Sequence, residues 1–312
     1  MAIGGETAVG LDTVSADGQA EELEVVAPPP PAIMWRRARG HKGFLLGGGF
    51  VLFVVLVAVF AGLLAPYGPY EQVLADRLID PIWGPKGTWA HPLGTDGFGR
   101  DYLTRLMYGS RVSLLIGFCA AMISAVIGGT AGIIGGYFGG RTDSVVMYLV
   151  NVKLSLPPIL VTLSLISVFG SSVLTVTVII GFVFWDRYAV VLRSVTQQIR
   201  AQDYITAAQA VGASHLRIIL SEVLPNLLNQ IIVIASLEMA IAILVEAVLS
   251  FLGLGIQAPT PSWGLMVAEG RKFMFFDPYL ITIPGVAILL LVISINMMGD
   301  GIRDITAPEG RN

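Results

Sequence analysis

The sequence feature that most constrains the fold is an apolar run of 22 residues, FLLGGGFVLFVVLVAVFAGLLA, at positions 44–65. A helix needs about 20 apolar residues to cross a bilayer, whereas the apolar core of a signal peptide has about 7–15. The run therefore predicts an uncleaved first transmembrane helix. Five further apolar runs are long enough to cross, and they lie near 112–137, 145–169, 173–195, 228–252 and 279–299. We predict an all-α integral membrane protein with six transmembrane helices.

Composition supports this class and weighs against others. Charged residues make up 13% of the chain, about half of the roughly 25% that is usual in soluble domains. The net charge of -3 argues against nucleic acid as a partner, because binding to phosphates needs a concentrated basic surface. The single cysteine, Cys119, excludes an internal disulfide framework.

The charge distribution predicts the orientation. Residues 1–43 read as an acidic, proline-containing disordered tail that ends in a basic cluster beside the first span. By the positive-inside rule this cluster places the N-terminus in the cytoplasm. Six crossings then return the C-terminal tail, 307–312, to the same side. The first span and its extracytoplasmic loop occupy 44–110, and the transmembrane core occupies 111–306.

The segment YITAAQAVGASHLRIILSEVLPNLL, 204–228, is polar and helix-forming between two apolar runs. It fits the loose outline of a helix-turn-helix, but few of its side chains could contact bases or phosphates. Protein recognition fits better. We expect Gly212 to turn the chain, Ser214 to cap a second short helix and Pro225 to end it. The residues expected to shape a docking surface are Thr206, Ala207, Ala208, Gly212, Ala213, Ser214, Arg217 and Pro225.

No catalytic or nucleotide-binding signature is present. The sequence lacks a GxxxxGK[ST] phosphate loop, an HExxH motif and a GxSxG motif. The three histidines are too scattered to predict a metal site. We therefore expect no cofactor in this chain, and any energy for pumping must come from another subunit.

Polar residues inside apolar runs are the candidates for a translocation path, because ionisable groups in a bilayer are costly and often functional. The alternative is that they pair with other helices. The candidates are Asp186, Glu238, Glu246 and Asn296. A row of small residues, Ser124, Gly128, Gly132 and Gly136, predicts close helix packing, either within the chain or against a partner subunit.

Several motifs together resemble one family. They are TAAQAVG (206–212) followed by Leu224-Pro225, HPLGTDGFGRD (91–101), YGSRVSL (108–114), GGYFGGRTD (135–143), LSFLGLG (249–255), PSWG (261–264) and NMMGDGIRD (296–304). In this order they are similar to the permease subunits of ABC importers, and most of all to the second ("C") permease of dipeptide and oligopeptide systems.

The resemblance implies the ABC type I importer permease fold in a bacterial inner membrane. It implies a homologous second permease, two subunits that bind ATP and Mg, an extracytoplasmic binding protein and a peptide substrate. The segment 204–225 would then be the coupling loop that enters a groove of one ATPase. Two alternatives stay open: the same architecture importing nickel or another small solute, and a membrane scaffold or sensor that does not transport.

The residues of the outer loops suggest roles of their own. Asp96, Arg100 and Asp101 are expected to hold the 91–101 loop over the outer surface through local polar contacts. Trp263 is either a packed residue of a stiff turn or an exposed aromatic that touches the binding protein or covers the channel mouth. The coupling loop departs from the family pattern at Thr206, where a glutamate is usual, so its pairing with the ATPase is expected to differ.

Overall fold

The computed structural model describes residues 31–306, and every structural statement below concerns that range. The chain is helical almost throughout, which confirms the all-α prediction. The α-helices are α1 (Pro31–Gly40), α2 (Lys42–Leu64), α3 (Tyr102–Phe138), α4 (Gly140–Leu154), α5 (Pro158–Phe169), α6 (Val173–Val183), α7 (Asp186–Arg200), α8 (Asp203–Ala210), α9 (His215–Ile218), α10 (Leu224–Phe251), α11 (Trp263–Gly270) and α12 (Tyr279–Thr306).

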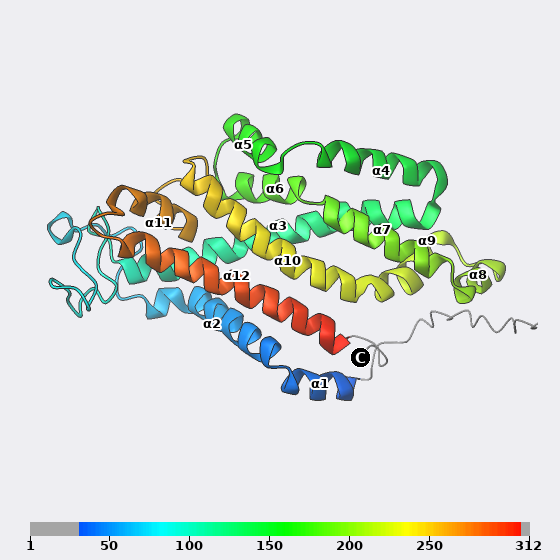
Figure 1. The fold of residues 1–312 in the computed structure, drawn as a ribbon, viewed down its shortest axis with the longest axis horizontal. Helices are drawn as coiled ribbons and strands as arrows, with labels where there is room; N and C mark the ends of the chain where they lie inside the picture. Colours follow the sequence, from blue (N-terminus) through cyan, green and yellow to red (C-terminus); the bar gives the residue numbers. More distant parts are fainter. Residues whose placement is uncertain (1–30, 307–312) are drawn as a thin grey trace, which may run out of the picture.

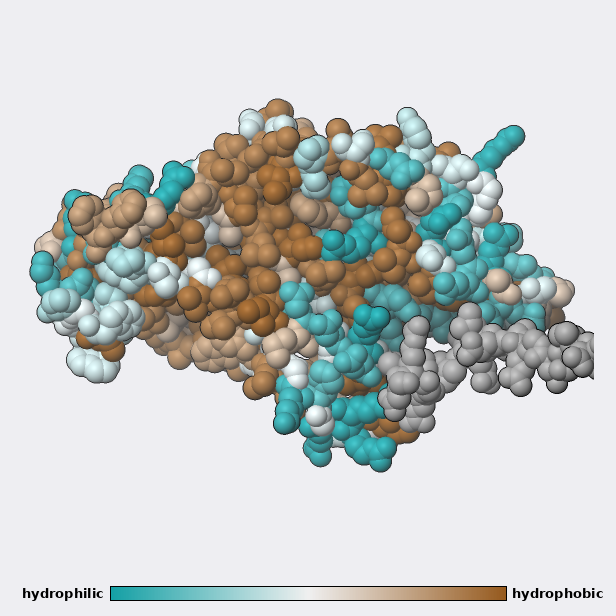
Figure 2. Space-filling view, in the orientation of Figure 1, coloured by the Kyte–Doolittle hydropathy of each residue, from teal (hydrophilic) through white to brown (hydrophobic). Residues whose placement is uncertain are grey.

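The long helices lie side by side and run between two ends of an elongated molecule (Figure 1). At one end are the loop between α2 and α3 and the helix α11. At the other end are α8 and α9. Hydrophobic residues cover the middle of the visible face, and hydrophilic residues gather toward the two ends (Figure 2). This distribution is that of a bundle that crosses a membrane with its two ends in water.

Four helices are long and apolar enough to cross a bilayer unbroken: α2, α3, α12 and the continuous helix His215–Phe251. Two predicted spans are bent instead. The pair α4–α5 is bent by 83° and the pair α6–α7 by 41°, and six spans result if each pair is counted as one. The span predicted near 145–169 is interrupted at Pro157 and Pro158, because proline disfavours helical backbone in the residue before it.

The small-residue row of α3 packs against α7 within the same chain. A Cβ atom added to Gly132 would lie 2.6 Å from the Ala189 carbonyl oxygen, and one added to Gly136 would lie 2.6 Å from the Arg193 carbonyl oxygen. Any larger side chain there would push the two helices apart. The contact shows that close intrachain packing, one of the two alternatives, accounts for these glycines.

The predicted helix end at Pro225 is wrong. Helix α9 continues through a π-helical turn, Ile219–Val223, into α10 without a break. Pro225 follows the π-helical turn directly, so the local change in the backbone hydrogen-bond pattern falls where proline has no N–H to donate. The Asn226 side-chain amide donates a hydrogen bond to the Glu222 carbonyl oxygen at 2.6 Å within this turn. The expected second short helix is therefore the beginning of a membrane-spanning helix.

Both described ends of the chain lie together. Helix α1 packs beside the end of α12, and His41 Nε2 lies 3.1 Å from Asp304 Oδ2. Part of the tail expected to be disordered, 1–43, is thus helical from Pro31 to Gly40. The rest of the predicted N-terminal tail, 1–30, and the predicted C-terminal tail, 307–312, lie outside the described residues.

Candidate functional site

The segment α8–α9, residues 203–218, closes one end of the bundle with a well-defined turn. Gly212 has a φ of +83°, a left-handed conformation that glycine adopts without steric cost. The Gly212 N–H donates to the Gln209 carbonyl at 3.0 Å, and the Ala213 N–H donates to the Ala208 carbonyl at 3.0 Å. These two bonds form a Schellman motif that ends α8. The Ser214 hydroxyl then accepts from the Arg217 N–H at 3.4 Å and caps α9, as predicted.

Buried aliphatic residues anchor the α8–α9 segment on the bundle. Ile205 and Ile218 are buried in a cluster that includes Leu192 of α7. The Tyr137 hydroxyl of α3 lies 3.1 Å from His215 Nδ1, which adds a polar tie to the same helices. The segment is therefore held to α3 and α7 by both apolar and polar contacts.

The outward side of this segment has an apolar surface with no cover in the described chain. Val211 is 85% exposed and Leu216 is 67% exposed, at the otherwise hydrophilic end of the molecule. A shallow hollow of about 310 Å3 lies between the two helices. Six predicted docking residues are exposed (Thr206, Ala207, Gly212, Ser214, Arg217 and Pro225), and two are partly buried (Ala208 and Ala213). Exposed apolar side chains around a rigid hollow are typical of a protein-docking surface.

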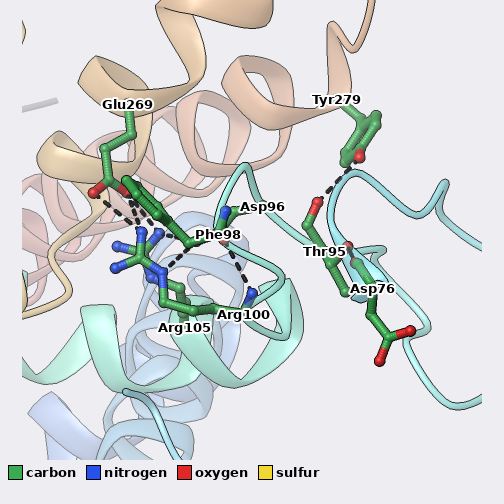
Figure 3. Close-up of polar contacts among 8 residues, drawn as sticks. All are labelled: Asp76, Thr95, Asp96, Phe98, Arg100, Arg105, Glu269 and Tyr279. Carbon is green, nitrogen blue, oxygen red and sulfur yellow. Dashed lines mark hydrogen bonds and ion pairs between the residues drawn. The ribbon is translucent and has the colours of Figure 1, made fainter. Parts of the chain in front are cut away.

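At the opposite end, three buried charged residues and the partly exposed Glu269 form a group that we call the loop network: Asp96, Arg100, Arg105 and Glu269 (Figure 3). Asp96 Oδ2 lies 2.6 Å from both Arg100 Nε and Arg105 Nη1. Glu269 Oε2 lies 2.6 Å from Arg105 Nη1 and 3.1 Å from Arg100 Nη2. Two cations and two anions thus neutralise one another and tie the loop to α3 and α11.

Backbone bonds complete the loop network. Asp96 Oδ1 accepts from the N–H groups of Phe98 and Arg100, at 2.8 and 3.0 Å. Asp101 caps α3 by accepting from the Thr104 N–H at 2.7 Å, and it lies 2.9 Å from His91 Nδ1. The predicted local contacts of Asp96, Arg100 and Asp101 are therefore present.

Sequence reasoning missed Arg105 and Glu269. Arg105 is 1% exposed, although it begins an apolar helix where a buried cation would be costly without partners. The free-energy cost of burying Arg105 could have indicated the site, because a buried arginine requires carboxylates nearby. The sequence could not identify Glu269 as one of them, since it lies 164 residues away.

Trp263 is packed rather than exposed. It is 3% exposed, its indole Nε1 donates to the Leu106 carbonyl at 2.8 Å, and its backbone N–H donates to Ser113 Oγ at 3.3 Å. These contacts join α11 to α3. The alternative of an exposed aromatic at this position is wrong, because the turn folds back onto the bundle.

The predicted path residues are all in contact with other groups of this chain. Glu238 is 3% exposed, and its Oε1 lies 3.4 Å from Arg187 Nη1. Asp186 forms an ion pair with Lys153. Both contacts join different helices, which is the arrangement expected of the structural alternative. A role of these residues in a translocation path stays a prediction.

Glu246 and Asn296 have local partners as well. Glu246 is 1% exposed, and its Oε1 accepts from the hydroxyls of Ser250 and Ser262, at 2.7 and 3.0 Å. It thereby joins α10 to the start of α11. The Asn296 side-chain amide donates to the Val292 carbonyl at 3.0 Å, within α12. Among residues 31–306, no group of three or more His, Cys, Asp or Glu side chains could hold a metal ion.

Comparison with known protein families identifies the family of this chain. Residues 128–311 match the family described as "Binding-protein-dependent transport system inner membrane component", and residues 31–81 match the "N-terminal TM domain of oligopeptide transport permease C". The first match covers more than half of the chain. The protein belongs to this family of inner-membrane transport components. It is a multi-pass permease subunit of the ABC importer type in the bacterial inner membrane.

Curated relatives of the permease are similar over nearly their whole length. The dipeptide transport system permease protein DppC of Haemophilus influenzae is 38% identical over 275 residues, which cover 88% of this chain and 93% of the relative. The DppC protein of Escherichia coli is 40% identical, over 93% of this chain and 98% of the relative. The glutathione permease GsiD of Pectobacterium atrosepticum is 34% identical, over 88% and 90%.

A solved structure supports the fold of the permease core. An inward-facing MetNI methionine ABC transporter aligns with a TM-score of 0.52 and 20% identity, over 66% of this chain and 98% of the matched chain. At this identity the likeness concerns the fold alone. It confirms the predicted ABC importer permease architecture.

Proposed function

We propose that this permease forms half of the membrane channel of an ABC importer for di- or oligopeptides. The observation that carries the proposal is the identity of 38–40% with dipeptide permeases over nearly the whole chain. The names of two relatives also refer to peptide transport: one is a di/tripeptide permease and the other a glutathione permease. A homologous second permease would complete the channel, and an extracytoplasmic binding protein would deliver the peptide at the end that holds the loop network.

The α8–α9 segment is the proposed contact with one of two ATP-binding subunits. Its support is the exposed apolar surface around a rigid turn, anchored by Ile205 and Ile218 to the bundle. ATP and Mg would be bound by those subunits, and their closure would tilt the bundle between inward-open and outward-open states. The permease itself would catalyse no reaction.

The proposed contact of α8–α9 with an ATP-binding subunit also implies an orientation of the permease in the membrane. The basic helix α1 and the end of α12 lie together, and both are expected on the cytoplasmic side with α8 and α9. The loop network then lies outside. Both termini of the permease would be cytoplasmic.

Uptake by a strain that lacks the permease gene tests the substrate class. Cells with and without the gene would receive labelled dipeptides, longer peptides and nickel. The proposal expects peptide uptake that depends on the gene, with nickel uptake unchanged. Nickel uptake that depends on the gene, without peptide uptake, would establish the small-solute alternative. If neither peptide uptake nor nickel uptake depends on the gene, the result would favour the alternative of a membrane scaffold that does not transport.

A further inference from the structure

Four charged side chains meet where the two bent helix pairs change direction. Lys153, at the end of α4, forms an ion pair with Asp186, the first residue of α7. The next residue, Arg187, reaches α10 and places its Nη1 atom 3.4 Å from Glu238 Oε1. This group is separate from both the loop network and the α8–α9 segment.

The group lies deep in the membrane-spanning part. Glu238 is fourteen residues from Leu224 and thirteen from Phe251, the two ends of α10. At 1.5 Å per residue, about 20 Å of helix extends on either side of it. Half of a hydrocarbon core is only about 15 Å thick, so Glu238 and its partner Arg187 fall within the apolar layer.

The two partners differ in exposure. The Glu238 side chain is 3% exposed, whereas the Arg187 side chain is 44% exposed. The bundle therefore buries the anion and presents the cation on its surface at this depth. An arginine that faces lipid at mid-depth is strongly disfavoured. The exposed side of Arg187 must accordingly face water or polar groups, as the wall of a channel does.

We propose that Arg187 is a carboxylate-binding residue on the translocation path and that it pairs with the C-terminal carboxylate of a passing peptide. The proposal rests on the proposed function of peptide import. A guanidinium has five N–H donors in a planar fork that matches a carboxylate, and the long contact with Glu238 occupies only one nitrogen. Lys153 is itself paired with Asp186, so Arg187 is the exposed cation of an electrically neutral group. The exposed guanidinium favours a carboxylate over a hydrated nickel cation at this position.

The first test measures peptides imported per ATP hydrolysed, in proteoliposomes that hold both permeases, the ATPases and the binding protein. We expect the ratio to fall about tenfold in Arg187→Gln, the loss of one charge-assisted hydrogen bond, and to recover only in part in Arg187→Lys, which restores the charge but not the planar fork. Arg187→Glu should import least. Arg193→Gln is the matched control, because Arg193 is also on α7 and pairs with Asp143. It should leave the ratio unchanged.

A double variant separates peptide binding from neutralisation of Glu238. Arg187→Gln alone leaves the Glu238 carboxylate buried without its cation. Arg187→Gln combined with Glu238→Gln removes both charges. The ratio should stay low in the double variant if Arg187 meets the peptide. Recovery to the wild-type ratio would overturn the proposal, because Arg187 would then serve only to neutralise Glu238.

Water access provides the third test. In a Cys119→Ser background, Arg187→Cys should react with a small water-soluble thiosulfonate much faster than Leu52→Cys. Leu52 is 58% exposed on α2 and is an apolar surface position. Equal, slow labelling of both would overturn the proposal. If wild-type vesicles import neither dipeptides nor longer peptides, the proposed function itself fails. If they import peptides and Arg187→Gln matches wild type, only the role of Arg187 fails.

Discussion

The two ends of the permease differ in the exposure and pairing of their side chains. At the loop end, Asp96, Arg100 and Arg105 are at most 4% exposed, and each has partners within the chain. At the other end, Val211 and Leu216 are more than half exposed, and Ala207 is exposed beside them. The charged groups of the loop end are paired within the chain, while the α8–α9 segment is rigid but uncovered. Changes at the first should therefore affect folding, and changes at the second should affect assembly and transport.

The largest effect should come from Arg105→Leu. It removes the cation shared by Asp96 and Glu269 and leaves two carboxylates with less charge compensation, which costs about 3–5 kcal/mol for a buried pair. We expect a large drop in the thermal midpoint of the purified permease pair and in the amount of folded protein. Arg77→Leu is the control, because Arg77 is exposed in the same loop and should change stability by less than about 0.5 kcal/mol. Equal midpoints for the two variants would show that the loop network is not a source of stability.

Ala207→Arg should have the next largest effect and act only on function. A long charged side chain on the proposed docking surface would hold the ATP-binding subunit away. The loss of binding free energy should match that of one hot-spot residue, about 2 kcal/mol, which is a roughly 30-fold loss of affinity. Transport and the amount of co-purified ATPase should fall by about that factor, with an unchanged thermal midpoint. Normal uptake by a normally expressed variant would remove the docking role. A fall in the thermal midpoint would instead show that Ala207 contributes to stability, as the loop network is expected to do.

Gly212→Ala should have a smaller, local effect. No atom lies within 4 Å of the added Cβ, so the cost arises from the left-handed backbone alone, about 1–2 kcal/mol. We expect amide hydrogen exchange around the α8 end to accelerate by roughly five- to thirtyfold. Gly49→Ala is the control, because Gly49 lies inside α2 and its added Cβ also meets no atom within 4 Å. Similar exchange in both variants would mean that the turn does not depend on glycine.

The smallest effect should come from Ser214→Ala. The cap bond is long, 3.4 Å, and exposed, so its loss should cost about 0.5 kcal/mol. Exchange at the Arg217 amide should rise about twofold, while transport stays within error. A severe transport defect would show that the Ser214 hydroxyl contacts the partner directly.

The sequence predicted the helical class, the approximate spans and the turn at Gly212, because these depend on apolar length and local backbone preference. It also located Asp96, Arg100 and Asp101 correctly, since they lie within one short loop. It could not predict that Glu269 joins them or that Arg187 reaches Glu238, because such pairs depend on how distant helices pack. The π-helical turn before Pro225 was missed for a different reason: proline usually marks a helix end, whereas here the helix continues through a π-helical turn beside it.

Cross-linking from both ends tests the contrast between them most directly. In a Cys119→Ser background, a photoreactive thiol reagent would be attached to Ala207→Cys or to Trp89→Cys, a loop residue that is 83% exposed. Ala207→Cys should cross-link to an ATP-binding subunit and react only in inside-out vesicles, whereas Trp89→Cys should react from outside the cell. Cross-linking of Ala207→Cys to the binding protein, or its reaction from outside, would contradict the account.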